Sequence, residues 1–459
     1  MRIIICGAGQ VGFGIAERLS AEQNDVSVID TSEKLIHDVR DLLDVRGFVG
    51  HGSHPDVLQA AGADEADMII AVTLYDEINM VACQVAHSLF NVPTKIARIR
   101  AQTYLQKQYQ EMFSRDNMPI DVVISPELEV GDMVLRRIAL PGASDVLRFA
   151  DEKVIAFAIE CMEDCPIIDT PLKQLTDLFP DLPSTVVGVV RNDKLFVPHS
   201  EDHLRAGDIA YVVTTADQVR RTLGLFGHDK PEARRIIIAG GGNIGLYVAK
   251  RMEERLPAHT RLKIIEHDRE RAAFVADELN KTIVLNGSAL DQDLLREAEV
   301  QDADLLVALT NQDQANILSS IMAKRLGCKS NMVLINNSAY QQFIHTVGID
   351  SYVSPKNVTI SKILQQVRRG RIRSVHSVYD GKAEIIEAEA LETSPLVGAP
   401  LRNIDLPAGL RVGAVYRDGK VIKPHGDLQI RRNDRVVMFA TSDTVKYVEQ
   451  MFRVSLDFF

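Results

Sequence analysis

The sequence repeats itself, in order, over most of its 459 residues. Residues 2–12 (RIIICGAGQVG) return as residues 235–245 (RIIIAGGGNIG), and residues 66–73 (ADMIIAVT) return as residues 303–310 (ADLLVALT). Ordered matches at nearly the same offset indicate an internal duplication. We therefore predict four domains in the order A–B–A′–B′, with the seam between the repeats near residues 227–231.

In the A segment, short apolar runs alternate with segments of helical period. The clearest helical segments are residues 11–19 and 78–90. The apolar runs, which we predict to be strands, are residues 3–6, 26–29, 46–49, 68–72 and 94–99. Strands that alternate with helices predict βαβ units and a parallel sheet covered on both faces. Segment A is therefore predicted to be a doubly wound α/β domain.

The B segment has a different pattern, typical of a small α+β module. Its β-like runs are residues 154–160, 185–191, 194–198 and 209–214, and its short helical runs are residues 171–178 and 216–223. The sequence RNDK at 191–194, which returns as RDGK at 417–420, predicts a hairpin turn.

Three glycines, in the pattern Gly7-x-Gly9-x-x-Gly12, follow the first predicted strand and open the first predicted helix. In this context Gly7 permits a tight turn, Gly9 lets the backbone approach a pyrophosphate, and Gly12 packs the helix on its strand. The backbone N–H groups of Gln10 and Val11 are then free to bind an anion. The pattern predicts a Rossmann-like domain that binds a dinucleotide.

An acidic residue ends the second strand in each repeat, Asp30 in A and Glu266 in A′. A carboxylate at this place accepts hydrogen bonds from the ribose hydroxyls and repels a 2′-phosphate. No Arg follows Asp30 directly, so we expect NAD(H) rather than the 2′-phosphorylated cofactor. The second repeat keeps the three glycines at Gly240, Gly242 and Gly245. We therefore predict one nucleotide site in each repeat.

The repeats differ at the end of the fifth strand, where Arg98 and Arg100 of A align with Leu334 and Asn336 of A′. Two guanidinium groups at this edge of the sheet are suited to clamp phosphates. The competing interpretation is that both arginines form ion pairs with nearby carboxylates such as Glu127 or Glu129. ATP or ADP is therefore an additional candidate ligand at the first site only.

No residue pattern predicts catalysis. A dehydrogenase needs a proton donor or acceptor beside the nicotinamide and a substrate domain, and the B segment of roughly 80 residues is small for that task. His51 and His54 have no counterpart in the second repeat. The Cys161–Cys165 segment has too few ligands for zinc, so we expect a loop with a half-buried thiol there and no metal site.

The net charge, the cysteines and the apolar runs exclude several classes of protein and of partner. The net charge of −11 argues against double-stranded nucleic acid as a partner. Five scattered cysteines do not make a disulfide framework, and no apolar stretch reaches the roughly 18 residues of a membrane-spanning helix. The first residues lead directly into a strand, so we expect no signal peptide and a cytoplasmic protein.

The duplicated arrangement resembles the TrkA family of potassium-uptake regulators, which consist of two tandem RCK (KTN) units. The matching segments are GAGQVG at 7–12 with Asp30, GHGS at 50–53, AVT at 71–73 with 76–79, ARIR at 97–100 and SPE at 125–127. The resemblance spans almost the whole chain. It implies two Rossmann-like doubly wound parallel-sheet domains, each followed by a small α+β RCK C-terminal domain. The implied domains are residues 1–123, 143–227, 232–348 and 368–453.

The family resemblance also implies a function without catalysis. It implies a subunit peripheral at the inner face of the cell membrane, assembled as a homo-oligomer, a tetrameric ring, that gates a potassium-translocating membrane subunit of the TrkH or TrkG type. NAD⁺ or NADH, and ATP or ADP, are the implied ligands. The implied binding residues are Gly7, Ala8, Gly9, Gln10, Val11, Asp30, Thr73, Leu74, Arg98, Arg100, Gly240, Gly241, Gly242, Asn243, Ile244, Glu266 and Thr310.

Two alternatives remain at this point. A soluble NAD-dependent reductase requires a catalytic residue that we do not find in the sequence. A nucleotide-sensing scaffold for another partner has the same sequence features, because the partner surface carries no motif.

Overall fold

A computed structural model describes residues 1–228, 231–255, 260–341, 343–367 and 372–452. The chain divides into two compact units, each built from two stretches of sequence. Unit 1 comprises Met1–Asp132 and Arg235–Gln366, and unit 2 comprises Met133–Arg234 and Val367–Phe459. Equivalent parts of the two repeats thus lie in the same unit. Residues 229–230 of the predicted seam lie outside the described residues.

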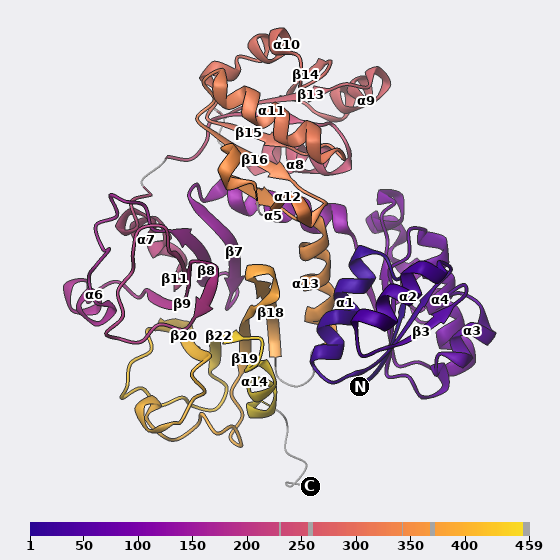
Figure 1. The fold of residues 1–459 in the computed structure, drawn as a ribbon, viewed down its shortest axis with the longest axis horizontal. Coiled ribbons are helices and arrows are strands. Elements are labelled where there is room, and N and C mark those ends of the chain that lie inside the picture. The colour runs from indigo at the N-terminus through magenta and orange to yellow at the C-terminus, as the bar shows by residue number, and fades with distance from the viewer. Residues whose placement is uncertain (229–230, 256–259, 342, 368–371, 453–459) are drawn as a thin grey trace. The chain divides into compact units, whose positions relative to one another are not determined.

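The first domain of unit 1 is a six-stranded parallel sheet, drawn in indigo and purple in Figure 1. Its order is β3-β2-β1-β4-β5-β6, so the order reverses between β1 and β4. The strands are β1 (Arg2–Cys6), β2 (Asp25–Asp30), β3 (Arg46–Val49), β4 (Met68–Ala71), β5 (Thr94–Arg98) and β6 (Val122–Ile124). Sheets of this type bind ligands at the carboxyl ends of the strands, beside such a reversal.

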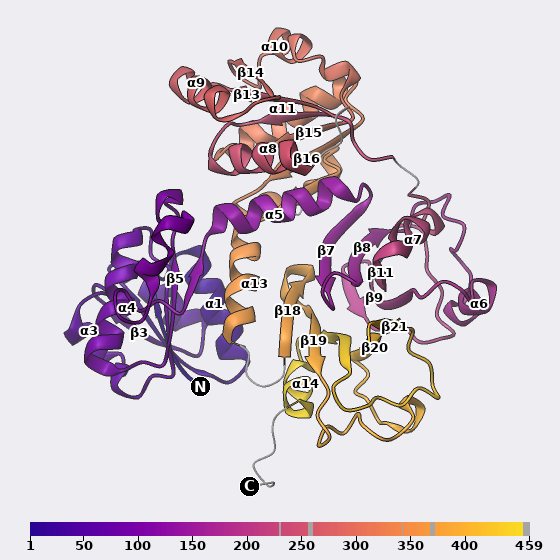
Figure 2. The same ribbon diagram turned by 180° about the vertical axis from the view of Figure 1, so that it is seen from behind.

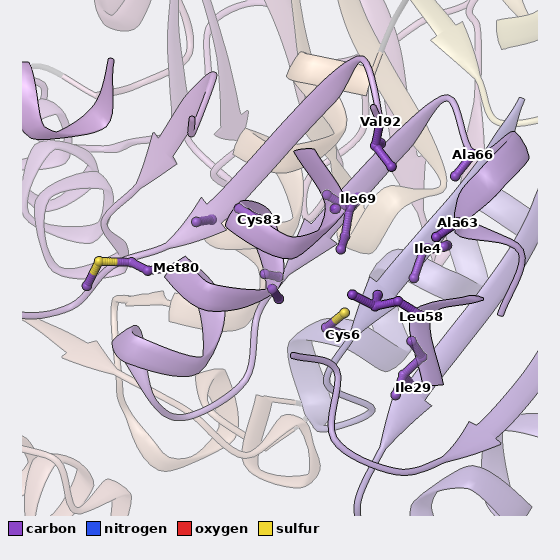
Figure 3. Close-up of a cluster of buried hydrophobic side chains, with 14 of the residues drawn as sticks. Ile4, Cys6, Ile29, Leu58, Ala63, Ala66, Ile69, Met80, Cys83 and Val92 are labelled. Atoms are coloured by element: carbon purple, nitrogen blue, oxygen red, sulfur yellow. The ribbon is translucent and has the colours of Figure 1, made fainter. Parts of the chain in front are cut away.

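Helices cover this sheet and close a core of aliphatic side chains. Figure 3 shows part of the core, where Ile4 and Ile69 of adjacent strands lie near Leu58 and Val92. The helices are α1 (Gln10–Ala21), α2 (Glu33–Leu42), α3 (Pro55–Ala60) and α4 (Asp76–Phe90). Helix α4 ends at Asn91, whose φ of 52° places it in the left-handed conformation that commonly ends helices.

The second domain of unit 1 repeats this topology in the order β14-β13-β12-β15-β16-β17. Its strands are β12 (Arg235–Ala239), β13 (Arg261–Glu266), β14 (Ile283–Asn286), β15 (Leu305–Ala308), β16 (Ser330–Leu334) and β17 (Ser351–Val353). Its helices include α8 (Asn243–Arg255), α9 (Arg269–Glu278), α10 (Gln292–Glu297), α11 (Asp313–Arg325) and α12 (Ser338–Gln341).

One long helix follows each parallel sheet, α5 (Pro126–Ala139) and α13 (Pro355–Val367). Each begins with a proline, which is favoured at the first helical position. Within unit 1, the Tyr247 hydroxyl of α8 donates a hydrogen bond to Asp132 Oδ1 of α5 at 2.8 Å. Ile360 of α13 lies directly against Gly14 of α1. Each helix therefore contacts the Rossmann domain of the other repeat.

Unit 2 contains two five-stranded antiparallel sheets, visible from behind in Figure 2, in the orders β10-β9-β11-β8-β7 and β18-β19-β22-β20-β21. The first comprises β7 (Ala143–Phe149), β8 (Val154–Glu160), β9 (Thr185–Arg191), β10 (Lys194–Phe196) and β11 (Ile209–Thr215), with helices α6 (Leu172–Leu178) and α7 (Val219–Leu225). The second comprises β18 (Ile372–Val378), β19 (Ala383–Glu389), β20 (Leu410–Arg417), β21 (Lys420–Ile422) and β22 (Arg435–Thr441), with helix α14 (Val445–Met451).

The two sheets of unit 2 share one hydrophobic core. The ring of Phe439 on β22 lies over Gly188 on β9, where a Cβ atom would come within 2.6 Å of it. Tyr211 of β11 also contacts Phe439, with ring centroids 5.6 Å apart. The absence of a side chain at Gly188 thus makes room for the aromatic residue of the other repeat.

The predicted fold class is confirmed: two Rossmann-like parallel sheets, each followed by a small α+β module. The predicted hairpin at 191–194 is present, with φ of 49° at Asn192 and 59° at Asp193. Strand β7 and helix α5 were not predicted from the sequence. In the part of the chain that the structure describes, no helix has the length and apolar character needed to cross a membrane.

Candidate nucleotide-binding sites

The glycine-rich loop takes the same shape in both repeats. Gly7 and Gly240 each have φ of +110°, a conformation that disfavours any other residue. A Cβ atom at Gly12 or Gly245 would overlap the carbonyl oxygen of the first glycine of its own loop. These four glycines therefore fix a tight connection from β1 to α1 and from β12 to α8.

The middle glycine of each loop faces open space. A Cβ atom at Gly9 or Gly242 would meet no other atom within 4 Å. Gly9 is the N-cap of α1, and no side chain caps that helix. The backbone N–H groups of Gln10 and Val11 therefore remain available to a phosphate at the helix N-terminus.

The predicted acidic residues lie directly against the loops. Asp30 Oδ2 accepts a hydrogen bond from the Ala8 N–H at 2.7 Å, and Oδ1 accepts one from the Ser32 N–H at 2.9 Å. In the second repeat, Glu266 Oε2 accepts a hydrogen bond from the Gly241 N–H at 2.6 Å. Each carboxylate oxygen has further lone pairs, so both acids can also accept hydrogen bonds from ribose hydroxyls.

A buried asparagine positions the threonine at the end of β4. Asn79 Oδ1 accepts hydrogen bonds from Thr73 N–H at 2.8 Å and from Thr73 Oγ1 at 2.7 Å, and its Nδ2 donates to the Arg98 carbonyl at 2.9 Å. Asn316 makes the same contacts with Thr310, at 3.0 and 2.6 Å. The carboxyl ends of the fourth and fifth strands of each sheet are thereby locked together.

Arg98 is buried with an incompletely satisfied guanidinium. Arg98 is 9% exposed. Its Nη2 donates a hydrogen bond to the Thr73 carbonyl at 2.6 Å. Its buried Nε has no hydrogen-bond partner among the described residues. Burial, and to a smaller extent the charge of Arg100, lowers the pKa of Arg98. A buried cation of this kind favours an anionic ligand beside it.

Arg100 has a protein partner. Its Nε donates to Glu127 Oε1 at 3.0 Å, while Glu127 Oε2 is buried without a partner in the described structure. The two arginines therefore differ: the sequence alternative of an ion pair describes Arg100, whereas Arg98 makes no such contact among the described ion pairs.

The second site has a cation that sequence reasoning missed. Arg271 of α9 donates from Nε to the Gly241 carbonyl at 2.8 Å and from Nη2 to Asn243 Oδ1 at 3.2 Å. It is the third residue after Asp268, the N-cap of α9, and the equivalent residue of α2 is Leu35. As expected, Leu334 at the end of β16 and Asn336 just beyond it stand where the first repeat has arginines. The positive charge of the second site comes instead from α9. The sequence signal that could have revealed this cation was the difference between Leu35 in the first repeat and Arg271 at the equivalent position of the second.

A cavity of about 860 Å³ lies within unit 1 and brings many of the predicted residues together. Its walls include Gln10, Val11, Arg98, Arg100, Gly240, Gly242, Asn243, Ile244, Glu266, Arg271, Thr310 and Lys356. The predicted site residues that are not among the described wall residues are Gly7, Ala8, Gly9, Asp30, Thr73, Leu74 and Gly241, and Leu74 is 71% exposed. The cavity therefore joins most of the second site to the phosphate side of the first.

Two Rossmann-like domains with glycine-rich loops of the same shape, each followed by an α+β module, define a protein of two tandem units. The sequence profile of the TrkA-N domain matches residues 3–126 and 236–355, and that of the TrkA-C domain matches residues 157–227 and 385–453. The chain therefore belongs to the TrkA family.

Curated relatives match this chain along its full length. The Trk system potassium uptake protein TrkA of Azorhizobium caulinodans is 61% identical over 459 residues, with 100% of each chain covered. The protein of the same name from Halomonas elongata is 40% identical over 463 residues, again with 100% of each chain covered.

Solved structures support the fold. The crystal structure of the GsuK RCK domain superposes with a TM-score of 0.59 at 17% identity, covering 98% of this chain and 94% of that one. The GsuK channel bound to NAD gives a TM-score of 0.59 at 16% identity, with 98% and 78% coverage.

Proposed function

We propose that this chain is the nucleotide-binding regulatory subunit of a Trk-type potassium uptake system, with no catalytic activity of its own. The observation that carries the proposal is the full-length match at 61% identity to a Trk system potassium uptake protein. The paired nucleotide-type loops give such a subunit the means to respond to a ligand.

The residues present fit adenine nucleotides. At the first site, the N–H groups of Gln10 and Val11 hold a phosphate group, Asp30 holds the ribose, and Thr73 with Leu74 borders the site. The buried, partly unpartnered Arg98 adds charge for a further phosphate, assisted by Arg100. This set accommodates NAD(H) and also ATP or ADP.

The second site holds NAD(H) through a parallel set of contacts. The loop from Gly240 to Ile244 holds the phosphate group and Glu266 the ribose, while Thr310 borders the site. Arg271 supplies the positive charge that β16 does not. Both sites are therefore suited to a nucleotide, but with the cation on different elements.

Regulation requires a ligand that binds two conformations unequally. A nucleotide with equal affinity for both conformations changes neither population, however tightly it binds. We propose that the chain forms a closed homo-oligomer, a tetrameric ring, at the inner face of the cell membrane. There it transmits the ligand-dependent change to a potassium-translocating subunit of the TrkH or TrkG type.

We propose domain limits of 1–123, 143–227, 232–348 and 368–453 for the four domains. Positions 368 and 453 lie outside the described residues.

Capture of the membrane partner tests this function. The tagged chain, mixed with detergent-solubilised membranes of the source cells, is expected to retain a potassium-translocating membrane protein, and nucleotide is expected to change the amount retained. A chain that binds nucleotide but retains no potassium-translocating protein would favour the scaffold alternative. Oxidation of NADH by the purified chain would favour the reductase.

A further inference from the structure

Two cysteines lie at the ends of the turn that follows β8. Cys161 and Cys165 are 1% and 3% exposed, although the three residues between them are exposed. The Cys165 N–H donates to the Met162 carbonyl at 3.1 Å and closes the turn. Both side chains therefore enter the same hydrophobic core of the first C-terminal module. The sequence expectation of one half-buried thiol was wrong, because the turn folds both thiols inward.

The backbone fixes the positions of both cysteines. Cys161 N–H donates to the Asp208 carbonyl, and Gly207 N–H donates to the Cys161 carbonyl, each at 2.8 Å. The Cys165 thiol lies 3.4 Å from the carbonyl oxygen of Leu225, the last residue of α7. The pair is thus held between the end of β8, the start of β11 and the end of α7.

A hydrogen bond between the two thiols lowers the pKa of Cys165, and the same contact together with burial raises the pKa of Cys161. Cys165 therefore has more thiolate character than an ordinary buried cysteine, and the thiolate is the form that reacts with disulfides. Cys161 supplies the adjacent second sulfur.

The second repeat shows that the turn does not need the cysteines. Ala390 and Ser394 occupy the equivalent positions. Ala390 N–H donates to the Asp434 carbonyl at 2.8 Å, and Ser394 N–H donates to the Leu391 carbonyl at 2.9 Å. The dithiol is therefore a chemical difference between two modules that have the same local backbone.

We propose that Cys161 and Cys165 form a reversible intrachain disulfide, which makes the first C-terminal module a thiol–disulfide exchange site. The oxidant is a low-molecular-weight disulfide such as oxidised glutathione. The Cys165 thiolate attacks one sulfur of that disulfide, so that a mixed disulfide forms and one small thiol leaves. Cys161 then loses its proton to solvent and attacks Cys165 sulfur, which releases the second small thiol. Two protein thiols are oxidised, and one small disulfide is reduced to two thiols.

The other three cysteines provide internal controls. Burial raises the pKa of Cys6 to about 12 and also raises the pKa values of Cys83 and Cys328. Cys6 and Cys83 lie in the core of the first Rossmann domain (Figure 3). These three thiols are expected to remain reduced while the chain stays folded.

The consequence of oxidation is local. A disulfide removes the Cys165 thiol hydrogen that the Leu225 carbonyl accepts. Leu225 ends α7, and the chain enters the second Rossmann domain a few residues later, at β12. Oxidation thus changes a contact at the end of α7.

The test uses the full chain in glutathione buffers of stepped oxidised-to-reduced ratio, followed by acid quenching, alkylation and peptide mass spectrometry. We expect the peptide that contains Cys161 and Cys165 to lose two hydrogens at an oxidising ratio and to regain them on reduction. At pH 7 we expect Cys165 to be alkylated at least tenfold faster than Cys6. Cys161→Ala and Cys165→Ser place the residues of the second repeat at these positions. The Cys161→Ala chain should accumulate the glutathione mixed disulfide at Cys165, and the Cys165→Ser chain should form no disulfide.

Two results would overturn the proposal. One is a folded wild-type chain that keeps both thiols at the most oxidising ratio. The other is a disulfide that forms only after unfolding in urea, which would show that the native turn does not bring the sulfurs together.

Discussion

The Asp30 carboxylate accepts a hydrogen bond from the Ala8 backbone N–H at 2.7 Å, and so ties the end of β2 to the glycine-rich loop. Glu266 and Gly241 repeat this contact at 2.6 Å. The acid of each site therefore has two roles, because the group that would bind the ribose also holds the loop in place. Variants of Asp30 must be judged by binding and by folding together.

Asp30→Ala is expected to weaken NADH binding at the first site by about 1.5–3 kcal/mol, the scale of a hydrogen bond to a charged group. Calorimetry of the full chain measures this change. Asp30→Asn serves as the matched control, because its side-chain oxygen can still accept from Ala8 but carries no charge. NADH affinity equal to that of the wild type in the Asp30→Ala chain would remove Asp30 from the ribose site.

Replacement of both Arg98 and Arg100 by Ala is expected to abolish most of the preference of the first site for ATP over AMP. Each charge-assisted contact to phosphate is worth about 1.5–3 kcal/mol, so the preference should fall at least tenfold. Binding that depends on Glu266 should persist. Titration of ATP and AMP into the wild-type and the double-variant chains gives the comparison, and equal ATP affinity in both would end the clamp hypothesis.

The single variants should separate the roles of the two arginines. Arg98→Ala is expected to account for most of the lost ATP affinity, because Arg98 Nε has no protein partner in the described structure. Arg100→Ala leaves Glu127 buried without its ion pair, so we expect a lower melting temperature and a smaller change in binding. The opposite order of effects on ATP affinity would contradict this assignment.

The Arg271→Leu variant gives the second site the residue that the first site has at the equivalent position, Leu35. Loss of the guanidinium beside Gly241 is expected to weaken nucleotide binding at the second site by about 1.5–3 kcal/mol and to leave the first site unchanged. Calorimetry in the Asp30→Ala background isolates the second site. Unchanged affinity in that background would show that Arg271 only supports the loop.

Each C-terminal module contains a nearly buried Arg–Asp pair. Arg191 donates to Asp208 at 2.9 and 2.7 Å, and Arg417 donates to Asp434 in the same way, at 2.8 and 2.6 Å. Removing one member of a buried pair costs about 3–5 kcal/mol. The Arg191 side chain is 24% exposed, so Asp208→Asn should destabilise its module by about 3 kcal/mol. Thermal unfolding measures the loss, with exposed Asp193→Asn as control; equal melting temperatures would refute it.

Much of the fold was predictable because the duplication gives each pattern twice. The strands of the Rossmann domains are short runs of β-branched residues, and the glycine motif fixes where the first of them ends. Strand β7 was missed because its pairing with β8 shifts register between Ser144 and Leu147, and Asp145 has φ of 47°. Such an irregular strand has no clean alternation of polar and apolar residues.

Most of the candidate site was predictable where the two repeats share residues, and Arg98 and Arg100 were predictable from a difference between the repeats. The glycines, the acids and the threonines follow from the motif and its repetition. The charge of Arg271 did not follow, because Arg271 belongs to the start of α9 and reaches the loop only in three dimensions. The difference between Arg98 and Arg100 did not follow either, because the sequence offers Glu127 to both arginines and only the fold pairs it with Arg100.

Potassium flux through the membrane partner is the most direct test of the account. The partner is reconstituted in liposomes with the wild-type chain or with the Asp30→Ala chain, and flux is measured with ATP, ADP, NADH, NAD⁺ or no nucleotide. We predict that at least one nucleotide changes the flux at least severalfold with the wild-type chain, and that Asp30→Ala shifts this response to higher nucleotide concentration. Flux that is independent of every nucleotide, with the chain bound to its partner, would contradict it.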